Sequence, residues 1–259
     1  MITISNYVKA ESLEQAYELN QKRTNRILGG MMWMRLSKGR VQTAIDLSGL
    51  GLDQIEESDE EFRIGCMCSL RSLELHKGLN TYFQNAIKES VRHIVGVQFR
   101  NGATVGGSIF GRFGFSDVLT CFLALDSYVE LYKGGIVSLA DFVKMERDND
   151  ILVRIILKKN DCKVRYITER VTATDFPIIA CAVSHVGDDW KVSVGARPMK
   201  ADLVAENIAL HAPEEAETFA KRMAESFSYG TNMRGSKEYR QRLAEVLIKR
   251  AVQSLMEEG

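Results

Sequence analysis

The chain has 259 residues, of which 45% are hydrophobic, so it can bury a substantial core as one large domain or two modest ones. Its 34 basic residues balance 34 acidic residues, whereas an electrostatically driven nucleic-acid binder normally carries a basic excess. No window approaches the roughly 18 apolar residues of a membrane-spanning helix, and the first residues lack the pattern of a signal peptide. We therefore expect a cytoplasmic protein without a nucleic-acid or membrane partner.

Residues 1–34 have the pattern strand, helix, strand and glycine turn. Residues 2–8 predict a short strand, and Ser12-Leu-Glu-Gln15 has the form of a capping box that opens a helix to about Asn20. Arg26-Ile-Leu-Gly-Gly30 is an apolar strand end that meets two glycines, the order in which a βαβ unit presents backbone amides to a phosphate. The bulky run Met31-Met-Trp-Met34 predicts either core packing or a wall against a flat aromatic ligand.

The next part of the chain predicts two strands and a long helix. Residues 43–47 and 61–65 have strand patterns, and the acidic segment 53–60 between them predicts a solvated connection. Apolar residues from Leu79 to Val91 recur at helical spacing, which predicts an amphipathic helix over residues 78–93.

Three glycines, Gly102, Gly106 and Gly107, fall within six residues directly after that helix. Glycine lets the backbone approach another group closely. If that group is a pyrophosphate, the N–H groups of Thr104 to Ser108 are the expected donors, and no basic side chain is needed. Taken alone, such a stretch is more often ordinary turn chemistry. We call residues 26–33 the first glycine bend and residues 104–108 the second, and we expect one diphosphate to lie between them.

The pattern changes near residue 150, where we place a domain boundary at Asn149. Before it, residues 122–131 predict a buried segment, and a Gly134-Gly135 turn separates them from residues 136–143. After it, four segments predict successive strands of an antiparallel sheet: residues 151–157, 164–168, 178–185 and 190–194.

Two helices are predicted at the C-terminal end of the sequence. Pro213 and an acidic first turn open one, and Ser236 is the predicted N-cap of the other. The second helix carries the basic residues Arg240, Arg242, Lys249 and Arg250. These predict a solvated face, with a docking surface as the alternative.

The five cysteines show no repeated spacing, and they are Cys66, Cys68, Cys121, Cys162 and Cys181. An odd number in a cytosolic chain predicts buried or free thiols and no disulfide framework. Cys66-x-Cys68 matches neither zinc nor plant-type iron–sulfur spacing, and the four histidines form no i, i+4 pair. We expect no metal site on this chain.

A set of short motifs spans nearly the whole chain. They are Leu28-Gly29-Gly30, Ile64-Gly65, Arg100 to Ile109, Ser116-Asp117, Leu123-Ala-Leu-Asp126, Thr174-Asp-Phe-Pro177, Gly235 to Arg240, Leu243 to Leu247 and Arg250-Ala251. In this order they resemble the FAD-binding (medium) subunit of the molybdenum hydroxylases, the family that includes xanthine dehydrogenase and carbon monoxide dehydrogenase.

The resemblance implies an α+β fold with two domains. Residues 1–149 would form an FAD-binding domain of the vanillyl-alcohol-oxidase (PCMH) type with two subdomains. Residues 150–259 would form the C-terminal domain of the carbon monoxide dehydrogenase flavoprotein type, an antiparallel sheet plus helices.

The resemblance also implies FAD on this chain, with the iron–sulfur clusters and molybdopterin on partner subunits. The chain lacks the cysteine sets of an iron–sulfur subunit and the bulk of a molybdopterin subunit. Electrons would pass from the partner's clusters through FAD to NAD⁺ or another acceptor, while the partner hydroxylates the substrate. The flavin carries the redox chemistry, so we expect no catalytic acid, base or nucleophile on this chain.

The resemblance assigns cofactor-binding residues position by position. Arg26, Ile27, Leu28, Gly29, Gly30, Met31, Met32 and Trp33 would line the first glycine bend, and Thr104, Gly106, Gly107 and Ser108 the second. Asp117 would meet the adenosine ribose and diphosphate region, while Ile94 and Leu152 would lie near the isoalloxazine ring. Main-chain amides suit phosphate oxygens, a carboxylate suits ribose hydroxyls, and aliphatic side chains suit a flat ring.

The sequence departs from the family pattern at both bends. Many relatives have Gly-Gly-Thr-Asp at the first bend, where Met31 and Met32 replace the polar pair, and Ser108 stands where many carry Asn. Backbone donation survives the first change, but a side-chain hydrogen bond to the cofactor would be lost.

Two alternatives remain open at this point. A self-sufficient FAD-dependent oxidoreductase would need clustered acid and base groups aimed at the ring, and no such cluster stands out. A non-redox assembly subunit that has lost FAD is the other alternative, and the Met31-Met32 departure favours it.

Overall fold

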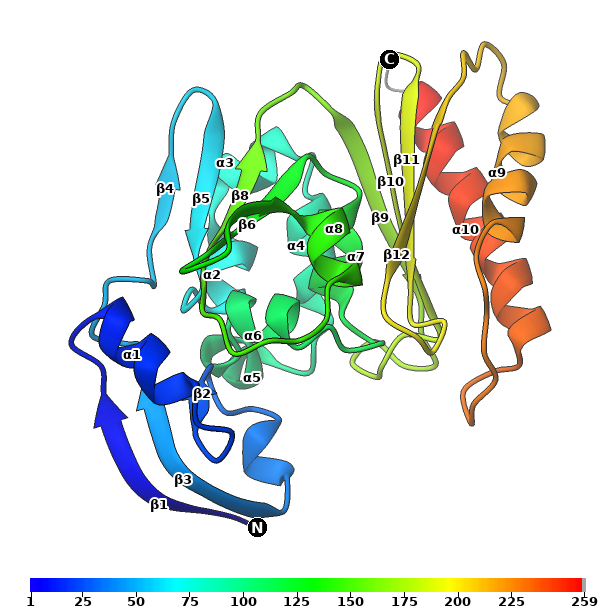
Figure 1. Cartoon of the computed structure of the whole chain (residues 1–259). Helices are drawn as coiled ribbons and strands as arrows, with labels where there is room; N and C mark the ends of the chain where they lie inside the picture. The colour runs from blue at the N-terminus through cyan, green and yellow to red at the C-terminus, as the bar shows by residue number, and fades with distance from the viewer. Residues whose placement is uncertain (258–259) are drawn as a thin grey trace. The chain divides into compact units, whose positions relative to one another are not determined.

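A computed structural model describes residues 1–257, and the chain folds into two compact units that interleave along the sequence (Figure 1). Unit 1 comprises Met1–Ser72, Val97–Gly111 and Ser127–Leu157. Unit 2 comprises Leu73–Gly96, Arg112–Asp126 and the chain from Lys158 onward. The domain boundary at Asn149 stays a prediction.

Unit 1 begins with a parallel three-stranded sheet in the order β1-β3-β2. β1 spans Ile2–Lys9, α1 spans Leu13–Asn20, β2 spans Arg26–Leu28 and β3 spans Gly39–Asp46, with a short 3-10 helix, η1, at Met34–Leu36. The Ser12 side chain accepts the N–H of Gln15 at 3.1 Å, and Gln15 Oε1 accepts the N–H of Glu11 at 2.8 Å. The predicted capping box and the strand–helix–strand order before the first glycine bend are therefore confirmed.

A five-stranded sheet forms the rest of the β structure of unit 1, in the order β4-β5-β8-β6-β7 (Figure 1). Its strands are β4 at Ile55–Glu57, β5 at Glu61–Gly65, β6 at Ser127–Leu131, β7 at Gly135–Ser138 and β8 at Leu152–Lys158.

Two sequence predictions about this five-stranded sheet were wrong. The acidic segment 53–60 is more than a connection, because β4 pairs with β5 and Ile55 lies opposite Ile64. Residues 151–157 do not begin the C-terminal sheet, because β8 pairs with β6 and Ile156 lies opposite Tyr128. The pairing of β8 with β6 joins segments more than twenty residues apart, so a local pattern does not report it. β4 pairs with its neighbour β5, but its acidic residues Glu56 and Glu57 resemble a solvated loop in sequence.

Short helices replace the turn and the long helix predicted between residues 70 and 110. They are α2 at Leu70–Leu75, α3 at Lys77–Tyr82, α4 at Ala86–Arg92, α5 at Val97–Gly102 and α6 at Val105–Phe110; α8 follows β7 at Leu139–Lys144. The helix predicted over 78–93 breaks between α3 and α4, where Gln84 and Asn85 have φ of 45° and 63°. The buried Asn80 side chain supports the break, because its Oδ1 accepts the N–H of Lys88 at 3.0 Å.

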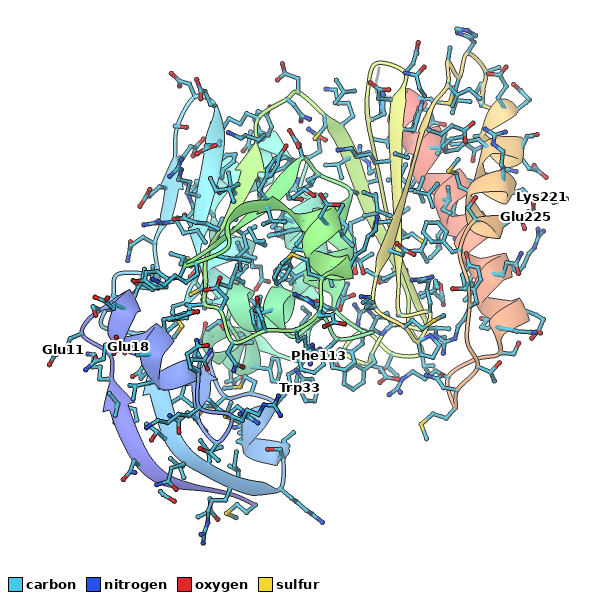
Figure 2. The ribbon with its side chains drawn as sticks, viewed as in Figure 1. Glu11, Glu18, Trp33, Phe113, Lys221 and Glu225 are labelled. Carbon is cyan, nitrogen blue, oxygen red and sulfur yellow. The ribbon has the colours of Figure 1, made fainter. Side chains whose placement is uncertain are left out.

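Unit 2 contains the predicted antiparallel sheet, in the order β12-β11-β10-β9. The strands are β9 at Lys163–Glu169, β10 at Ile179–Val186, β11 at Asp189–Gly195 and β12 at Asp202–Asn207, the last of which the sequence did not predict. The two predicted helices, α9 at Glu215–Glu225 and α10 at Lys237–Glu257, pack on one face of this sheet (Figure 1). In Figure 2, Lys221 and Glu225 point outward from α9.

The other face of the unit 2 sheet is also covered, which explains its continuous apolar runs. Ile179, Cys181 and Val183 of β10 face the helices α9 and α10. On the opposite side α7, at Asp117–Leu123, approaches so closely that a Cβ at Gly195 would lie 2.0 Å from Thr120 Oγ1. Asp117, the predicted ribose ligand, begins this helix.

The structure corrects the prediction for one basic residue of α10. Arg240 is 1% exposed, and its guanidinium donates to the carbonyl oxygens of Ile178 and Ala196 and to the side chain of Asn232. It therefore holds the ends of β10 and β11 to the helix and does not belong to a solvated face. Arg242, in contrast, is exposed and pairs with Glu245 at 2.5 Å. Ser236 is confirmed as the N-cap, because its hydroxyl accepts the N–H of Tyr239 at 3.2 Å.

All five cysteines are free and buried, as expected from their number and spacing. Within residues 1–257 no group of three or more His, Cys, Asp or Glu side chains is arranged to hold a metal ion. Across the same residues, none of the helices combines the length and the apolar composition that crossing a bilayer requires.

Candidate cofactor site

The two glycine bends meet within unit 1, although about seventy residues separate them in sequence. A Cβ at Gly30 would lie 1.7 Å from the carbonyl oxygen of Gly102, and Gly30 has a φ of +46°. A Cβ at Gly29 would lie 2.9 Å from Thr104 Oγ1 and 3.8 Å from the nitrogen of Gly107. The contacts of Gly29 with Thr104 and Gly107 confirm the expected approach of the two bends, and no larger residue fits at Gly30, which lies against the backbone just before the second bend.

Two main-chain N–H groups of the first glycine bend have no acceptor among the described residues. Within residues 1–257, the N–H groups of Gly30 and Met32 donate no hydrogen bond to another residue, while that of Met31 turns back to the Gly29 carbonyl. Gly30 and Met32 are half-buried. Main-chain N–H groups that have no acceptor among the described residues are available to an anion. The first bend therefore fits the phosphate oxygens of a dinucleotide.

The second glycine bend differs because its amides are engaged inside the chain. The N–H of Gly106 donates to Cys66 O at 2.8 Å, that of Gly107 to Thr104 Oγ1 at 3.2 Å, and that of Ser108 to Thr104 O at 3.1 Å. Thr104 is thus the N-cap of α6. These amides were predicted to donate to a diphosphate, whereas in the structure they start a helix and attach it to the neighbouring backbone.

The two adjacent glycines of the second bend have different surroundings. Gly106 is buried, and a Cβ there would lie 2.7 Å from Cys66 O. Gly107 is exposed, and Thr104 Oγ1 at 3.1 Å is the only neighbour of its Cβ position within 4 Å among the described residues. Its Cα lies beside the first bend, 3.7 Å from the Cβ position of Gly29. Gly106 serves backbone packing, and Gly107 leaves an open surface next to the free donors.

The methionine and tryptophan side chains of the first bend take different environments. Met31 holds a left-handed φ of 59°, which is uncommon for a residue with a Cβ. The terminal methyl of Met32 covers Gly102, 2.4 Å from its Cβ position. Trp33 is 38% exposed and packs edge-on against Phe99 with 5.8 Å between the ring centroids; Figure 2 labels it. Met32 therefore fits the packing interpretation, while Trp33 keeps an exposed surface.

The strand before the first bend fixes its position. Arg26, Ile27 and Leu28 form β2 and pair in register with residues 44–46 of β3. Arg26 is exposed, and its guanidinium donates to the Asn25 carbonyl at 2.7 Å, while Ile27 and Leu28 are half-buried. These three residues anchor the bend through the sheet.

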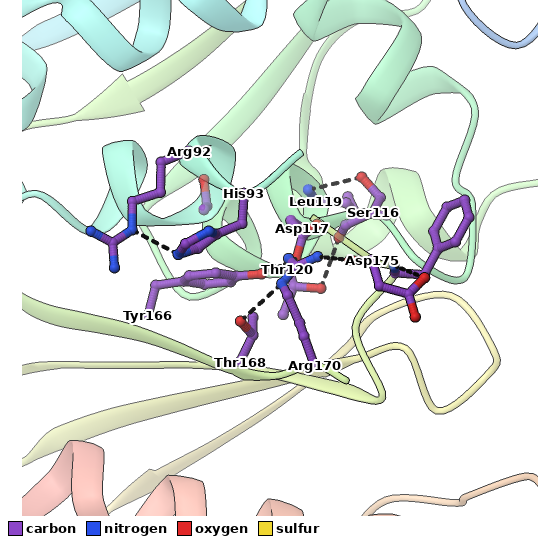
Figure 3. A network of polar contacts seen from close by, with 12 residues as sticks. Arg92, His93, Ser116, Asp117, Leu119, Thr120, Tyr166, Thr168, Arg170 and Asp175 are labelled. Atoms are coloured by element: carbon purple, nitrogen blue, oxygen red, sulfur yellow. Dashed lines mark hydrogen bonds and ion pairs between the residues drawn. The ribbon is translucent and has the colours of Figure 1, made fainter. Parts of the chain in front are cut away.

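Asp117 belongs to unit 2 and is the centre of a buried polar network (Figure 3). It is 4% exposed and begins α7 directly after the N-cap Ser116. Its Oδ1 accepts the hydroxyl of Tyr166 and the Nη2 of Arg170, each at 2.5 Å. Neither Tyr166 nor Arg170 was predicted from the sequence as a partner of Asp117. Their only local signal is the alternation of Tyr166, Thr168 and Arg170, which places the three on one face of β9 and its continuation.

Burial sets the protonation of this network. It raises the pKa of Asp117, an effect that the Arg170 charge and the Tyr166 hydroxyl oppose. Burial, and then the negative charge of Asp117, raise the pKa of Tyr166 well above its usual value, so Tyr166 stays a donor at neutral pH. His93 has a lowered pKa through burial and the charges of Arg92 and Arg170, and its Nε2 accepts the Nε of Arg92 at 2.9 Å.

The two residues predicted to lie near the flavin ring are found in different units. Ile94 follows α4 in unit 2 and is half-buried. Leu152 lies in β8 of unit 1, opposite Leu131, and is 5% exposed. Unit 1 therefore brings together the two glycine bends, while Asp117 and Ile94 belong to unit 2.

Residues 3–159, more than half of the chain, match the family described as the FAD binding domain in molybdopterin dehydrogenase. The nicotine 6-hydroxylase medium subunit of Paenarthrobacter nicotinovorans is 25% identical in an alignment 273 residues long, gaps included, that covers 95% of each chain. The uncharacterized protein YgfM of Escherichia coli K12 is 25% identical in an alignment 256 residues long that covers 95% of this chain and 94% of YgfM.

Solved structures with lower sequence identity share the fold. Quinoline 2-oxidoreductase from Pseudomonas putida 86 contains a chain with a TM-score of 0.83 at 17% identity, covering 99% of this chain and 98% of that one. Carbon monoxide dehydrogenase from Hydrogenophaga pseudoflava contains one with a TM-score of 0.84 at 19% identity, covering 97% of each. The predicted α+β fold is thereby confirmed. The match over residues 3–159 shows that the chain belongs to the family of FAD-binding domains of molybdopterin dehydrogenases.

Proposed function

We propose that this chain is the FAD-carrying subunit of a xanthine dehydrogenase-like molybdenum hydroxylase complex. In this role it passes electrons from the iron–sulfur clusters of a partner subunit to NAD⁺ or another acceptor. The family description supports FAD on this chain and molybdopterin in the complex, and the similarity to the nicotine 6-hydroxylase medium subunit supports a place in a multi-subunit complex. The observation that carries the proposal is the contact of the two glycine bends beside the free N–H groups of Gly30 and Met32.

Six of the predicted site residues have a task in this proposal. The N–H groups of Gly30 and Met32 bind the diphosphate, and Gly107 leaves room for it. Asp117 accepts a hydrogen bond from a ribose hydroxyl, and Leu152 and Ile94 offer aliphatic surface to the flavin ring. When bound, FAD supplies the redox chemistry, and the chain binds and orients it.

The composition of the two bends suits cofactor binding through the main chain. Residues 26–33 and 104–108 contain no Asp, Glu, His, Lys, Cys or Tyr. The bends therefore supply N–H donors to the diphosphate and no side chain that would act as an acid or a base there.

We also propose that the protein works in the cytoplasm. Its five cysteines are all free and buried, which is typical of proteins from a reducing compartment.

The absorption spectrum of the purified protein tests the proposal. We expect the visible bands of oxidised flavin, or their appearance after addition of FAD, and co-purification with an iron–sulfur and a molybdopterin subunit. A chain that binds no FAD would favour the non-redox assembly subunit and contradict our proposal. NADH-dependent dye reduction by the FAD-loaded chain tests the acceptor separately.

A further inference from the structure

Residues 22–40 of unit 1 concentrate positive charge in a chain whose net charge is zero. Between Glu18 and Asp46 the sequence contains basic residues and no acidic one. The basic residues are Lys22, Arg23, Arg26, Arg35, Lys38 and Arg40, and all of them are exposed. Like charges repel one another, so such a segment is well placed to meet an external group of opposite charge.

Most of these basic side chains have no partner in the part of the chain that the structure describes. Arg26 is the exception, because its guanidinium donates to the Asn25 carbonyl at 2.7 Å. The others make neither an ion pair nor a side-chain hydrogen bond within residues 1–257, and they are Lys22, Arg23, Arg35, Lys38 and Arg40. In contrast, the exposed Arg222 and Arg242 of unit 2 pair with Glu206 and Glu245 at 2.6 and 2.5 Å.

The fold gathers these cations around the amino-terminal half of β3. The turn that holds Lys22 and Arg23 lies against this strand, because Gln42 donates its N–H to the Thr24 carbonyl at 2.8 Å. On the other side of β3, β1 runs parallel to it from the level of Gly39 onward. Arg40 therefore lies in the central strand between β1 and the turn. Arg35 belongs to η1, which contacts β1 and leads directly into β3.

Apolar side chains are exposed within the same segment. Leu36 of η1, between Arg35 and Lys38 in the sequence, is 68% exposed, and Trp33 at the start of η1 is 38% exposed. Interfaces between proteins combine a few apolar residues with a polar rim, and Trp and Arg are enriched in them. We call Leu36 and the five unpartnered cations the basic surface.

We propose that the basic surface docks a protein partner that presents Asp and Glu side chains around an apolar centre. Its charge selects an acidic occupant. Leu36 favours a protein over a nucleic acid, whose backbone offers phosphates and no apolar group for a leucine. A bilayer is disfavoured because η1 has three residues, too few for the long apolar stripe of an interfacial helix. The proposal concerns unit 1 alone and does not depend on FAD.

Binding of a defined acidic polymer to the full 259-residue chain tests the proposal. The probe is a fluorescein-labelled copolymer of glutamate and tyrosine, which carries both carboxylates and apolar rings, and fluorescence anisotropy follows its binding. We expect the triple variant Arg35→Gln, Lys38→Gln, Arg40→Gln to bind it about tenfold more weakly at an ionic strength of about 0.1 M. At about 1 M the difference should shrink to within about twofold, because the Debye length falls from about 10 to about 3 Å.

Two matched variants separate a local surface from an effect of net charge. The control triple variant Lys77→Gln, Lys88→Gln, Lys221→Gln removes the same charge from exposed lysines that have no ion pair among residues 1–257. It should change copolymer binding by less than about twofold. Leu36→Ser should weaken copolymer binding about threefold and leave the binding of poly-L-glutamate unchanged, because leucine contributes only to the apolar centre.

Four results would overturn the proposal. The first is a wild-type chain that does not bind the copolymer, and the second is an equal loss in the two triple variants. The third is tighter binding of short duplex DNA, or of phosphatidylglycerol-containing vesicles, through the same three cations. The fourth is displacement of the copolymer by saturating FAD, which would assign the cations to the phosphates of the cofactor. A chain that binds the copolymer but no FAD would contradict the proposed function and leave the docking surface intact.

Discussion

The two glycine bends look alike in sequence and behave differently in the folded chain. In the first, the N–H groups of Gly30 and Met32 remain without acceptors among the described residues. In the second, the amides of Gly106, Gly107 and Ser108 are bonded internally. A glycine pair can therefore serve either ligand binding or backbone packing, and the acceptors of its amides show which. Substitutions in the two bends should therefore affect FAD binding and stability differently.

The largest effect is expected at Gly30 in the first bend. In Gly30→Ala the new methyl would overlap the Gly102 carbonyl, 1.7 Å away, at a backbone φ of +46°. We expect a loss of more than about 4 kcal/mol in the free energy of unfolding, or failure of unit 1 to fold. Chemical denaturation followed by circular dichroism measures it.

Gly51→Ala is the matched control for Gly30→Ala. Gly51 also has a positive φ, +66°, but its Cβ position has no neighbour within 4 Å among residues 1–257. Gly51→Ala should lower the free energy of unfolding by only about 1 kcal/mol. Equal losses in the two variants would show that the first bend does not press on the backbone of Gly102.

The residue beneath the second bend predicts a pH dependence. Burial raises the pKa of Cys66 from 9.0 to about 12. A raised pKa in the folded state means that the stabilisation is present below pH 9 and is lost as the pH rises from 9 to 12, by up to about 4 kcal/mol. Between pH 8 and 10.5, the free energy of unfolding of Cys66→Ala should therefore fall by about 2 kcal/mol less than that of the wild type. Parallel denaturation midpoints at the two pH values would contradict this.

Gly106→Ala tests the packing role in the second bend. The added methyl would lie 2.7 Å from Cys66 O, a backbone atom that cannot move aside easily. We expect a loss of about 2–3 kcal/mol in the free energy of unfolding. The FAD affinity of the folded protein should change less than its free energy of unfolding. A large loss of FAD affinity with little loss of stability would show that Gly106 contacts the ligand.

Gly107→Ala should show the opposite balance. Gly107 is exposed in the first turn of α6, where alanine is the better helix former, so stability should hold or rise by up to about 1 kcal/mol. FAD affinity should fall about tenfold, because the methyl occupies the surface beside the first bend. Fluorescence titration with FAD measures this, and unchanged affinity would place the diphosphate elsewhere.

The smallest expected effect is at Met31. Its φ of 59° suits asparagine better than methionine. Met31→Asn should raise the free energy of unfolding by roughly 0.5–1 kcal/mol. A lower melting temperature in a thermal scan would show that the Met31 side chain contributes more through packing than its backbone strain costs.

Local patterns predicted much of this protein. Four features were predicted correctly, because each depends on residues within one or two turns or strands. They are the capping box at Ser12, the strand that leads to Gly29 and Gly30, the antiparallel sheet of unit 2 and the helix with Ser236 as its N-cap. The order of short motifs was enough to indicate the family, since it combines many weak local signals.

Tertiary structure decided the features that join distant residues. The pairing of β8 with β6, the burial of Arg240, the contact of Gly30 with Gly102 and the ion pair of Asp117 with Arg170 all link segments far apart in sequence. The sequence by itself determined that two glycine bends exist, because glycine spacing is local. Only the tertiary structure decided which of their amides remain free. Folding supplies acceptors to the amides of the second bend, and among the described residues it supplies none to two N–H groups of the first.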